Sequence, residues 1–231
     1  MDANAWTQER INATFDLCRE EWRDKVAFDA AIHAALDAGL PPNAVEMDKH
    51  GFWTSVLQLA MEWGFGAKQN TDLLARLLAM GATPEPTREL QNRYRQRRSP
   101  LMLAIYYDCI PAAALLVQAG ANVNYVDHDG WTPLYLAVYE CHNVTPDMAL
   151  YIMDLPGVDL EVKSGKRRDT ALDVAIERAP YYRSCMVVRN ALRNKMESQS
   201  RRWTPARAAW LAATCIAFTH FPIRFYSQIW G

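Results

Sequence analysis

The chain has 231 residues, 50% of them hydrophobic and 22% charged, and a formal net charge of −1 at pH 7. This balance is typical of a folded globular chain and argues against a disordered one. A chain so close to neutral has no overall field that would draw it to nucleic acid, so nucleic-acid binding is not expected. Its 5 cysteines include no C-x-x-C pair, which indicates reduced thiols packed between helices, in the cytoplasm or nucleus.

The N-terminal segment is predicted to form an amphipathic helix over residues 5–24. Its large apolar side chains recur at helical spacing and lie on roughly one face. These side chains are Trp6, Ile11, Phe15, Cys18 and Trp22. We expect this helix to cap the N-terminal end of the fold, and binding of a separate partner by its apolar face is the alternative. The opening residues lack the basic start and apolar run of a secretory signal.

The middle of the chain carries one phrase at a fixed period. The segment S-P-L-M-L-A at 99–104 returns 33 residues later as T-P-L-Y-L-A at 132–137. Fainter copies are S-V-L-Q-L-A at 55–60 and T-A-L-D-V-A at 170–175. A period of this length indicates stacked helical hairpins, because one pair of short helices cannot bury its apolar face alone.

The best copy, within residues 94–159, resembles the ankyrin repeat. The run N-V-N-Y-V-D-H-D-G-W-T-P-L at 122–134 is similar to the family pattern D-V-N-x-x-D-x-x-G-x-T-P-L and departs from it at the first position. Upstream, L-L-V-Q-A-G-A at 115–121 resembles the end of the family's second helix. The resemblance implies an all-α ankyrin-repeat solenoid of about four to five helix-turn-helix repeats with short β-turn tips, closed by N- and C-terminal capping helices.

The residue types of the phrase have physical reasons. Ser or Thr at a helix entrance caps free N–H groups, and Pro in the first turn has no N–H to leave unpaired. The apolar positions are predicted to face one continuous interior, at Leu101, Ala104, Leu134 and Ala137. A left-handed glycine is predicted to end each preceding helix. These glycines are Gly39, Gly81, Gly120 and Gly157.

The C-terminal segment is strongly apolar. Thr204 and Pro205 form a helix start, and an apolar run at 208–218 leads into an aromatic tail with Phe221, Phe225, Tyr226 and Trp230. The run is shorter than the roughly 17–25 apolar residues that span a bilayer, so membrane insertion is not expected. We expect the segment to fold back and cap the last repeat. The alternative is that it binds a partner or encloses a ligand.

Three segments are therefore expected along the chain. Residues 1–24 form the N-terminal capping helix, 25–198 the repeat array, and 199–231 the C-terminal apolar helix and aromatic tail. The outer helix of the last repeat is expected around Met186, Val187, Ala191, Leu192 and Met196.

The resemblance also implies a binding surface, because ankyrin proteins usually bind through the turn tips and the exposed, concave face of the first helices. In the repeat at Thr132 the matching residues are His128, Asp129, Trp131, Tyr139 and Glu140. In the repeat at Ser99 they are Arg95, Gln96, Arg98, Tyr106 and Tyr107. The repeat at Ser55 supplies Gly51, Phe52, Thr54, Glu62 and Trp63, and the repeat at Thr170 supplies Lys166, Arg167, Asp169, Glu177 and Arg178.

The expected surface is aromatic and flanked by arginines, the residue types that dominate interface energies, so we expect it to bind a protein partner. Packing between repeats is the alternative role for Tyr106 and Tyr107. The basic runs at 93–98 and 166–168 are either solvated loops or contacts for an acidic or phosphorylated partner.

Catalytic patterns are weak. The chain has no H-E-x-x-H, Walker or G-x-S-x-G motif, and the adjacent Cys141 and His142 match a structural turn of the repeat. We expect neither catalysis nor a bound cofactor or metal. The alternative function is binding of a small hydrophobic ligand or substrate between the last repeat and the aromatic tail, which would leave an enzymatic role open.

Overall fold

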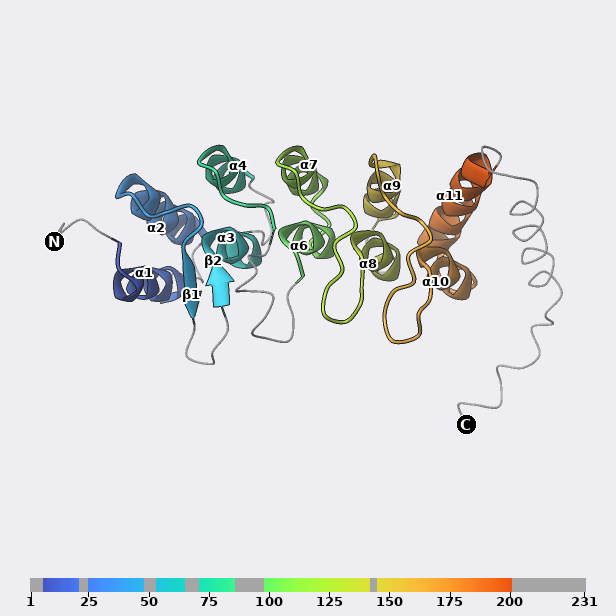
Figure 1. Ribbon diagram of the computed structural model, residues 1–231, viewed down its shortest axis with the longest axis horizontal. Coiled ribbons are helices and arrows are strands. Elements are labelled where there is room, and N and C mark those ends of the chain that lie inside the picture. Colours follow the sequence, from blue (N-terminus) through green and yellow to red (C-terminus); the bar gives the residue numbers. More distant parts are fainter. Residues whose placement is uncertain are drawn as a thin grey trace.

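The computed structural model describes residues 6–20, 25–47, 53–64, 71–85, 98–141 and 145–200. Within these residues the helices stack in two layers along the long axis of the molecule (Figure 1). The lower layer in that view contains α1 (Gln8–Glu20), α3 (Val56–Gly64), α6 (Pro100–Tyr106), α8 (Pro133–Glu140) and α10 (Ala171–Arg178). The upper layer contains α2 (Lys25–Asp37), α4 (Asp72–Ala79), α7 (Ile110–Gln118), α9 (Asp147–Asp154) and α11 (Arg183–Ser200).

Each lower helix forms a hairpin with the upper helix that follows it, and successive hairpins pack side by side. Contacts run from α3 to α6, from α6 to α8 and from α8 to α10, and α4 likewise contacts α7. This stacking confirms the all-α solenoid expected from the repeated phrase. The described strands are β1 (Val45–Met47) and β2 (Trp53–Ser55), which pair antiparallel between α2 and α3.

The hydroxyl residues of the phrase begin their helices as predicted. The Ser99 hydroxyl accepts from the Met102 N–H at 3.3 Å, and the Thr132 hydroxyl accepts from the Tyr135 N–H at 3.2 Å. The cap at Thr170 is reciprocal, because the Asp173 carboxylate also accepts from the Thr170 N–H and completes a capping box. Each cap satisfies N–H groups that would have no partner in the first turn.

The predicted interior is confirmed. Leu101 and Ala104 are fully buried, and Leu134 and Ala137 are each 2% exposed, all within one continuous core. Equivalent positions of neighbouring repeats thus share a single apolar interior. Truncating Leu101 to Ala would cost about 2–5 kcal/mol, since removing a buried leucine loses transfer free energy and leaves a cavity.

The helix-ending glycines adopt the predicted left-handed backbone. Gly81 and Gly120 both have φ of 91°. In each case the N–H of the residue after glycine donates to a carbonyl near the end of the helix. The Ala82 N–H donates to the Leu77 carbonyl and the Ala121 N–H to the Leu116 carbonyl, both at 2.9 Å. A residue with a Cβ atom would be strained at this positive φ, which is why glycine recurs at the ends of these helices.

At the N-terminal end, α1 lies against α2 and β1. Ile11 and Phe15 are buried at this contact, and the Trp6 indole N–H donates to the Ala38 carbonyl at 3.2 Å. The first segment of the described chain is therefore docked on the array through its apolar face.

At the other end, α11 covers the residues expected to form the outer helix of the last repeat. Cys185, Val188 and Leu192 are fully buried, whereas Met186 and Val187 are 39% and 44% exposed. The sequence pattern was ambiguous because adjacent apolar residues lie on different helical faces, and the packing of α10 against α11 decides which face turns inward.

The expected C-terminal apolar helix and tail, residues 199–231, fall outside the described residues from 201 onward. Among the residues that the structure does describe, no helix combines the length and the hydropathy that crossing a membrane requires.

Candidate functional site

Three aromatic residues form a cluster on one face of α8 and the turn before it. Trp131, Tyr135 and Tyr139 are spaced by four residues, which places them on successive turns of the same side. The Trp131 ring centroid lies 5.4 Å from that of Tyr135 and 4.8 Å from that of Tyr139. Tyr135 is buried, while Trp131 and Tyr139 are half-buried, so the cluster packs on the core and still presents an outer surface.

The turn at 127–131, called the α8 tip below, holds Trp131 in position. The Asp127 carboxylate accepts from the Trp131 N–H at 2.8 Å, and the Asp127 N–H donates to the Trp131 carbonyl at 3.0 Å. Burial raises the pKa of Asp127, and the hydrogen bond from Trp131 opposes that shift. Because its hydrogen bonds to Trp131 close the turn, Asp127 has a structural role at this site.

The turn at 164–169, called the α10 tip below, lies against the α8 tip. The Gly165 N–H donates to the Gly130 carbonyl at 2.9 Å. A Cβ built on Gly165 would lie 3.2 Å from the Trp131 indole nitrogen. A side chain at position 165 would therefore displace the indole from its present position. The two tips and Trp131 therefore form one packed unit.

From the next repeat, Arg178 at the end of α10 reaches over the aromatic cluster. Its guanidinium carbon lies 3.8 Å from the Tyr139 ring centroid, and its Nη1 donates to the Tyr139 carbonyl at 2.7 Å. A guanidinium stacked on a ring combines electrostatic attraction with dispersion. Trp131, Tyr139 and Arg178 thus form a continuous stack that joins two repeats.

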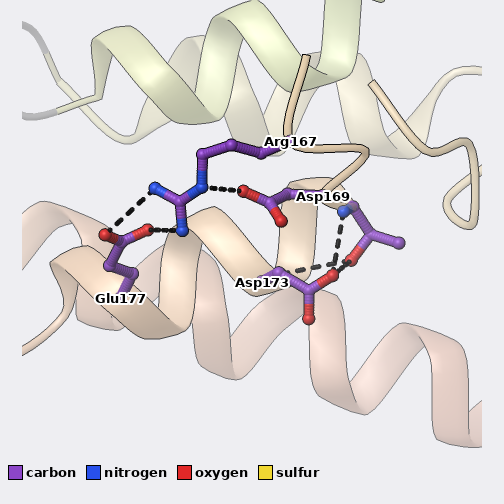
Figure 2. Close-up of polar contacts among 5 residues, drawn as sticks. Arg167, Asp169, Asp173 and Glu177 are labelled. Carbon is purple, nitrogen blue, oxygen red and sulfur yellow. Dashed lines mark hydrogen bonds and ion pairs between the residues drawn. The ribbon is translucent and has the colours of Figure 1, made fainter. Parts of the chain in front are cut away.

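A second arginine, Arg167 on the α10 tip, is oriented by two carboxylates (Figure 2). Its Nε lies 3.0 Å from Asp169, and its two terminal nitrogens lie 3.1 and 3.3 Å from the two oxygens of Glu177. The Arg167 side chain is 68% exposed, so solvent screens these ion pairs and they contribute little to stability. Their main effect is to fix the direction of the guanidinium.

These elements surround an open pocket of about 690 Å³, called the α8–α10 groove below. One wall is α8 with its tip, and the other is α10 with its tip and the turn that follows α10. The side chains that define it include Asp129, Trp131, Tyr135, Tyr139, Lys166, Arg167, Glu177, Arg178, Tyr181 and Tyr182. Its volume lies in the range of pockets that hold a small ligand or a few side chains of a partner.

Eight of the twenty residues predicted for the binding surface meet in this groove. They are Asp129, Trp131, Tyr139, Lys166, Arg167, Asp169, Glu177 and Arg178. His128 lies next to it on the α8 tip, with its Nε2 3.4 Å from the Asp129 carboxylate. Glu140 is half-buried at the end of α8 and does not line the groove.

The remaining predicted residues lie elsewhere. Arg98 stacks over Tyr106, with its guanidinium carbon 4.4 Å from the ring centroid, and Tyr107 contacts Tyr106 edge to face. Tyr106 is 46% exposed, whereas Tyr107 packs partly on the core. Trp63 belongs to α3, but its side chain is outside the described part of the structure, as is the whole of Arg95.

Tyr135, Tyr181 and Tyr182 line the groove but are not among the site residues expected from the sequence. Tyr135 could have been found from its position midway between Trp131 and Tyr139. Tyr181, at 67% exposed, and Tyr182 follow Pro180, where the turn after α10 brings them to the groove. Sequence offered no signal for that placement, since the direction of the turn depends on how α11 packs.

The two-layered stack of helical hairpins, with a groove between successive first helices and tips, defines a helical-repeat solenoid with an open groove on one side. Residues 57–164 match the family model described as ankyrin repeats (3 copies). This part of the chain therefore consists of ankyrin repeats. Ankyrin repeats are in general protein-protein interaction modules.

Proposed function

We propose that this chain binds a protein partner in the α8–α10 groove. The observation that supports this most directly is the stack of Trp131, Tyr139 and Arg178 along the groove wall. Tryptophan, tyrosine and arginine are the residues most often found to dominate binding energy at protein interfaces. Their concentration in one open groove favours a binding site over a merely structural surface.

The groove is organised before any partner arrives. Hydrogen bonds of the α8 tip hold Trp131, the stack holds Tyr139 and Arg178, and Glu177 orients Arg167. Side chains that are already ordered lose little conformational entropy on binding. A rigid, preformed surface therefore supports recognition by complementarity of shape and charge.

The charges favour an acidic or phosphorylated partner segment. Arg167 is paired with Asp169 and Glu177, but its neighbours Lys166 and Arg168 have no ion-pair partner among the described residues. Both side chains are exposed on the α10 tip. A carboxylate or phosphate of the partner would find Lys166 in the groove and Arg168 on the same tip.

Affinity capture with the full-length chain and quantitative mass spectrometry tests this proposal. Lys166→Glu reverses an exposed charge in the groove, and Lys163→Glu makes the same change on an exposed turn outside it. We expect Lys166→Glu to reduce recovery of the partner at least tenfold and Lys163→Glu to leave it unchanged. Equal recovery with both variants would refute the charge preference.

The groove itself is tested by Trp131→Ala and Tyr139→Ala, with Leu17→Ala as a control at an exposed apolar position of α1. Circular dichroism melts establish that each variant is folded. We expect the two groove variants to lose the partner and the control to retain it. Full binding by both folded groove variants would place the contact elsewhere.

A second candidate function is supported by the exposed apolar residues Met186 and Val187 on α11, which precedes the apolar segment. A hydrophobic ligand held between the last repeat and residues 201–231 would cover them. Deleting the chain from Arg201 onward should then abolish binding of a fluorescent hydrophobic probe such as ANS while the array still melts cooperatively. Unchanged probe binding would exclude this site, and an insoluble product would favour a capping role.

A further inference from the structure

Two cysteines that are distant in sequence meet inside the last repeats. Cys141 is the C-cap residue of α8, and Cys185 lies in the first turn of α11. Their Sγ atoms are 2.8 Å apart, and neither residue is exposed to solvent. The spacing of cysteines along the chain gave no sign of this pair, because the two positions are 44 residues apart.

The geometry favours bond formation. A disulfide has an S–S length of about 2.05 Å, so the two sulfur atoms need to approach by only about 0.8 Å. Small side-chain rotations can supply a movement of that size, because each Sγ moves with its χ1 angle. The helices that carry the two residues are already in place, so no rearrangement of the fold is needed.

We propose that Cys141 and Cys185 form a disulfide when the chain meets an oxidant. This disulfide links the end of α8 covalently to the start of α11. This modification site is inferred from the contact of the two cysteines and does not rest on the proposed binding function. A third buried cysteine of the described residues, Cys109, precedes α7 in an earlier repeat and serves as an internal comparison.

The chemistry is balanced with a peroxide as the oxidant. The thiolate of one cysteine attacks the O–O bond of hydrogen peroxide, which gives a sulfenic acid and releases water after proton transfer. The second thiol then attacks the sulfenic sulfur, its proton leaves with the hydroxyl group as a second water, and the S–S bond forms. Two thiols are oxidised and one peroxide is reduced to two waters.

Burial makes this reaction slow and selective. Burial is the largest cause raising the pKa of Cys141, the hydrogen bond and charge of Cys185 raise it further, and Arg178 and the Ser184 side chain lower it. The reactive thiolate is therefore scarce in the closed structure. Oxidation proceeds through local opening of the last hairpin, and reclosing returns the two sulfur atoms to contact.

The disulfide between Cys141 and Cys185 would act on both walls of the groove. Cys141 comes two residues after Tyr139, and Cys185 comes three residues after Tyr182, on the opposite wall. A covalent link between these positions limits how far the walls can separate. It also removes freedom from the unfolded chain, which stabilises the last two repeats.

The test treats the reduced full-length chain with hydrogen peroxide, blocks remaining thiols and maps disulfide-linked peptides by mass spectrometry without reduction. We expect the peptide pair containing Cys141 and Cys185 to be the main crosslink. The melting temperature should rise on the order of 5–10 °C and return to its starting value on reduction.

Single variants separate this pair from other thiols. Cys141→Ser and Cys185→Ala should each lose both the crosslink and the shift in melting temperature, while Cys109→Ser should keep both. Melts of the reduced variants show whether they are folded, and having two different variants keeps the test valid if one is not. A fully oxidised chain with no link between Cys141 and Cys185 would overturn the proposal.

Discussion

Asn43 and Asn124 make the same pair of hydrogen bonds to the following repeat. The Asn43 side chain donates to the Gly81 carbonyl at 3.0 Å and accepts from the Thr83 N–H at 2.7 Å. The Asn124 side chain donates to the Gly157 carbonyl at 2.7 Å and accepts from the Asp159 N–H at 2.9 Å. One amide can do both because it carries a donor and an acceptor, so it bridges two repeats through their backbones.

Replacing Asn124 by Ala should therefore destabilise the array. Two hydrogen bonds between repeats are lost, and we expect a decrease of about 1–2 kcal/mol in the free energy of unfolding. Urea denaturation followed by circular dichroism measures this. The same change at Asn194, which is exposed on α11, should have an effect near zero, and an equal effect at both sites would contradict the bridging role.

Glu85 occupies the equivalent position in the intervening repeat and predicts a pH dependence. Its carboxylate accepts from the Asn122 N–H at 2.6 Å. Burial raises the pKa of Glu85 above its ordinary value, and the hydrogen bond from Asn122 partly opposes this. The carboxyl group of Glu85 therefore holds its proton more tightly in the folded chain than in the unfolded chain. The stability linked to Glu85 is present below the pKa of the unfolded state and is lost as pH rises through the pKa of the folded state.

Glu85→Gln removes that titration while keeping an acceptor for Asn122. We expect the variant to gain stability relative to the original chain between about pH 4 and about pH 7. Urea midpoints of both proteins at the two pH values give the difference, in which all other titrating groups cancel. A difference that does not change with pH would show that the carboxyl of Glu85 has the same pKa in both states.

The stack of Arg178 on Tyr139 predicts energetic coupling between two repeats. Arg178→Lys keeps the charge but removes the planar group, and Tyr139→Leu keeps apolar volume but removes the ring. In a double-mutant cycle on unfolding free energies we expect a coupling of about 0.5–2 kcal/mol. Additive effects would mean that the stack contributes nothing beyond the packing of each side chain.

Gly165 predicts a steric effect that can be separated from backbone strain. Gly165 and Gly157 both have positive φ, 68° and 80°, but a Cβ on Gly157 meets nothing within 4 Å whereas one on Gly165 meets Trp131. Gly157→Ala should cost about 1–2 kcal/mol from strain alone. Gly165→Ala should cost more and should weaken partner binding by displacing the indole, and equal costs would show that Trp131 moves aside freely.

Local patterns were sufficient for the repeat architecture. Ser99 and Thr132 cap their helices and Gly81 ends one, because capping and left-handed backbone depend on neighbours within a few residues. Leu101 and Leu134 are buried because the helical period places them on the inner face. Such features are encoded within a single turn or helix, so sequence alone predicts them.

Residue spacing and residue types along the chain predict the stacked hairpins, their capped starts, their glycine ends and the aromatic character of α8. The packing of the folded chain alone reveals that Arg178 covers Tyr139, that Cys141 meets Cys185, and that α11 buries Val188 and exposes Val187. The first two of these relationships join different repeats, and the third depends on how α11 packs against α10. Contacts of that kind depend on how one hairpin is rotated and shifted on the next, and many side chains along the interface set that placement together.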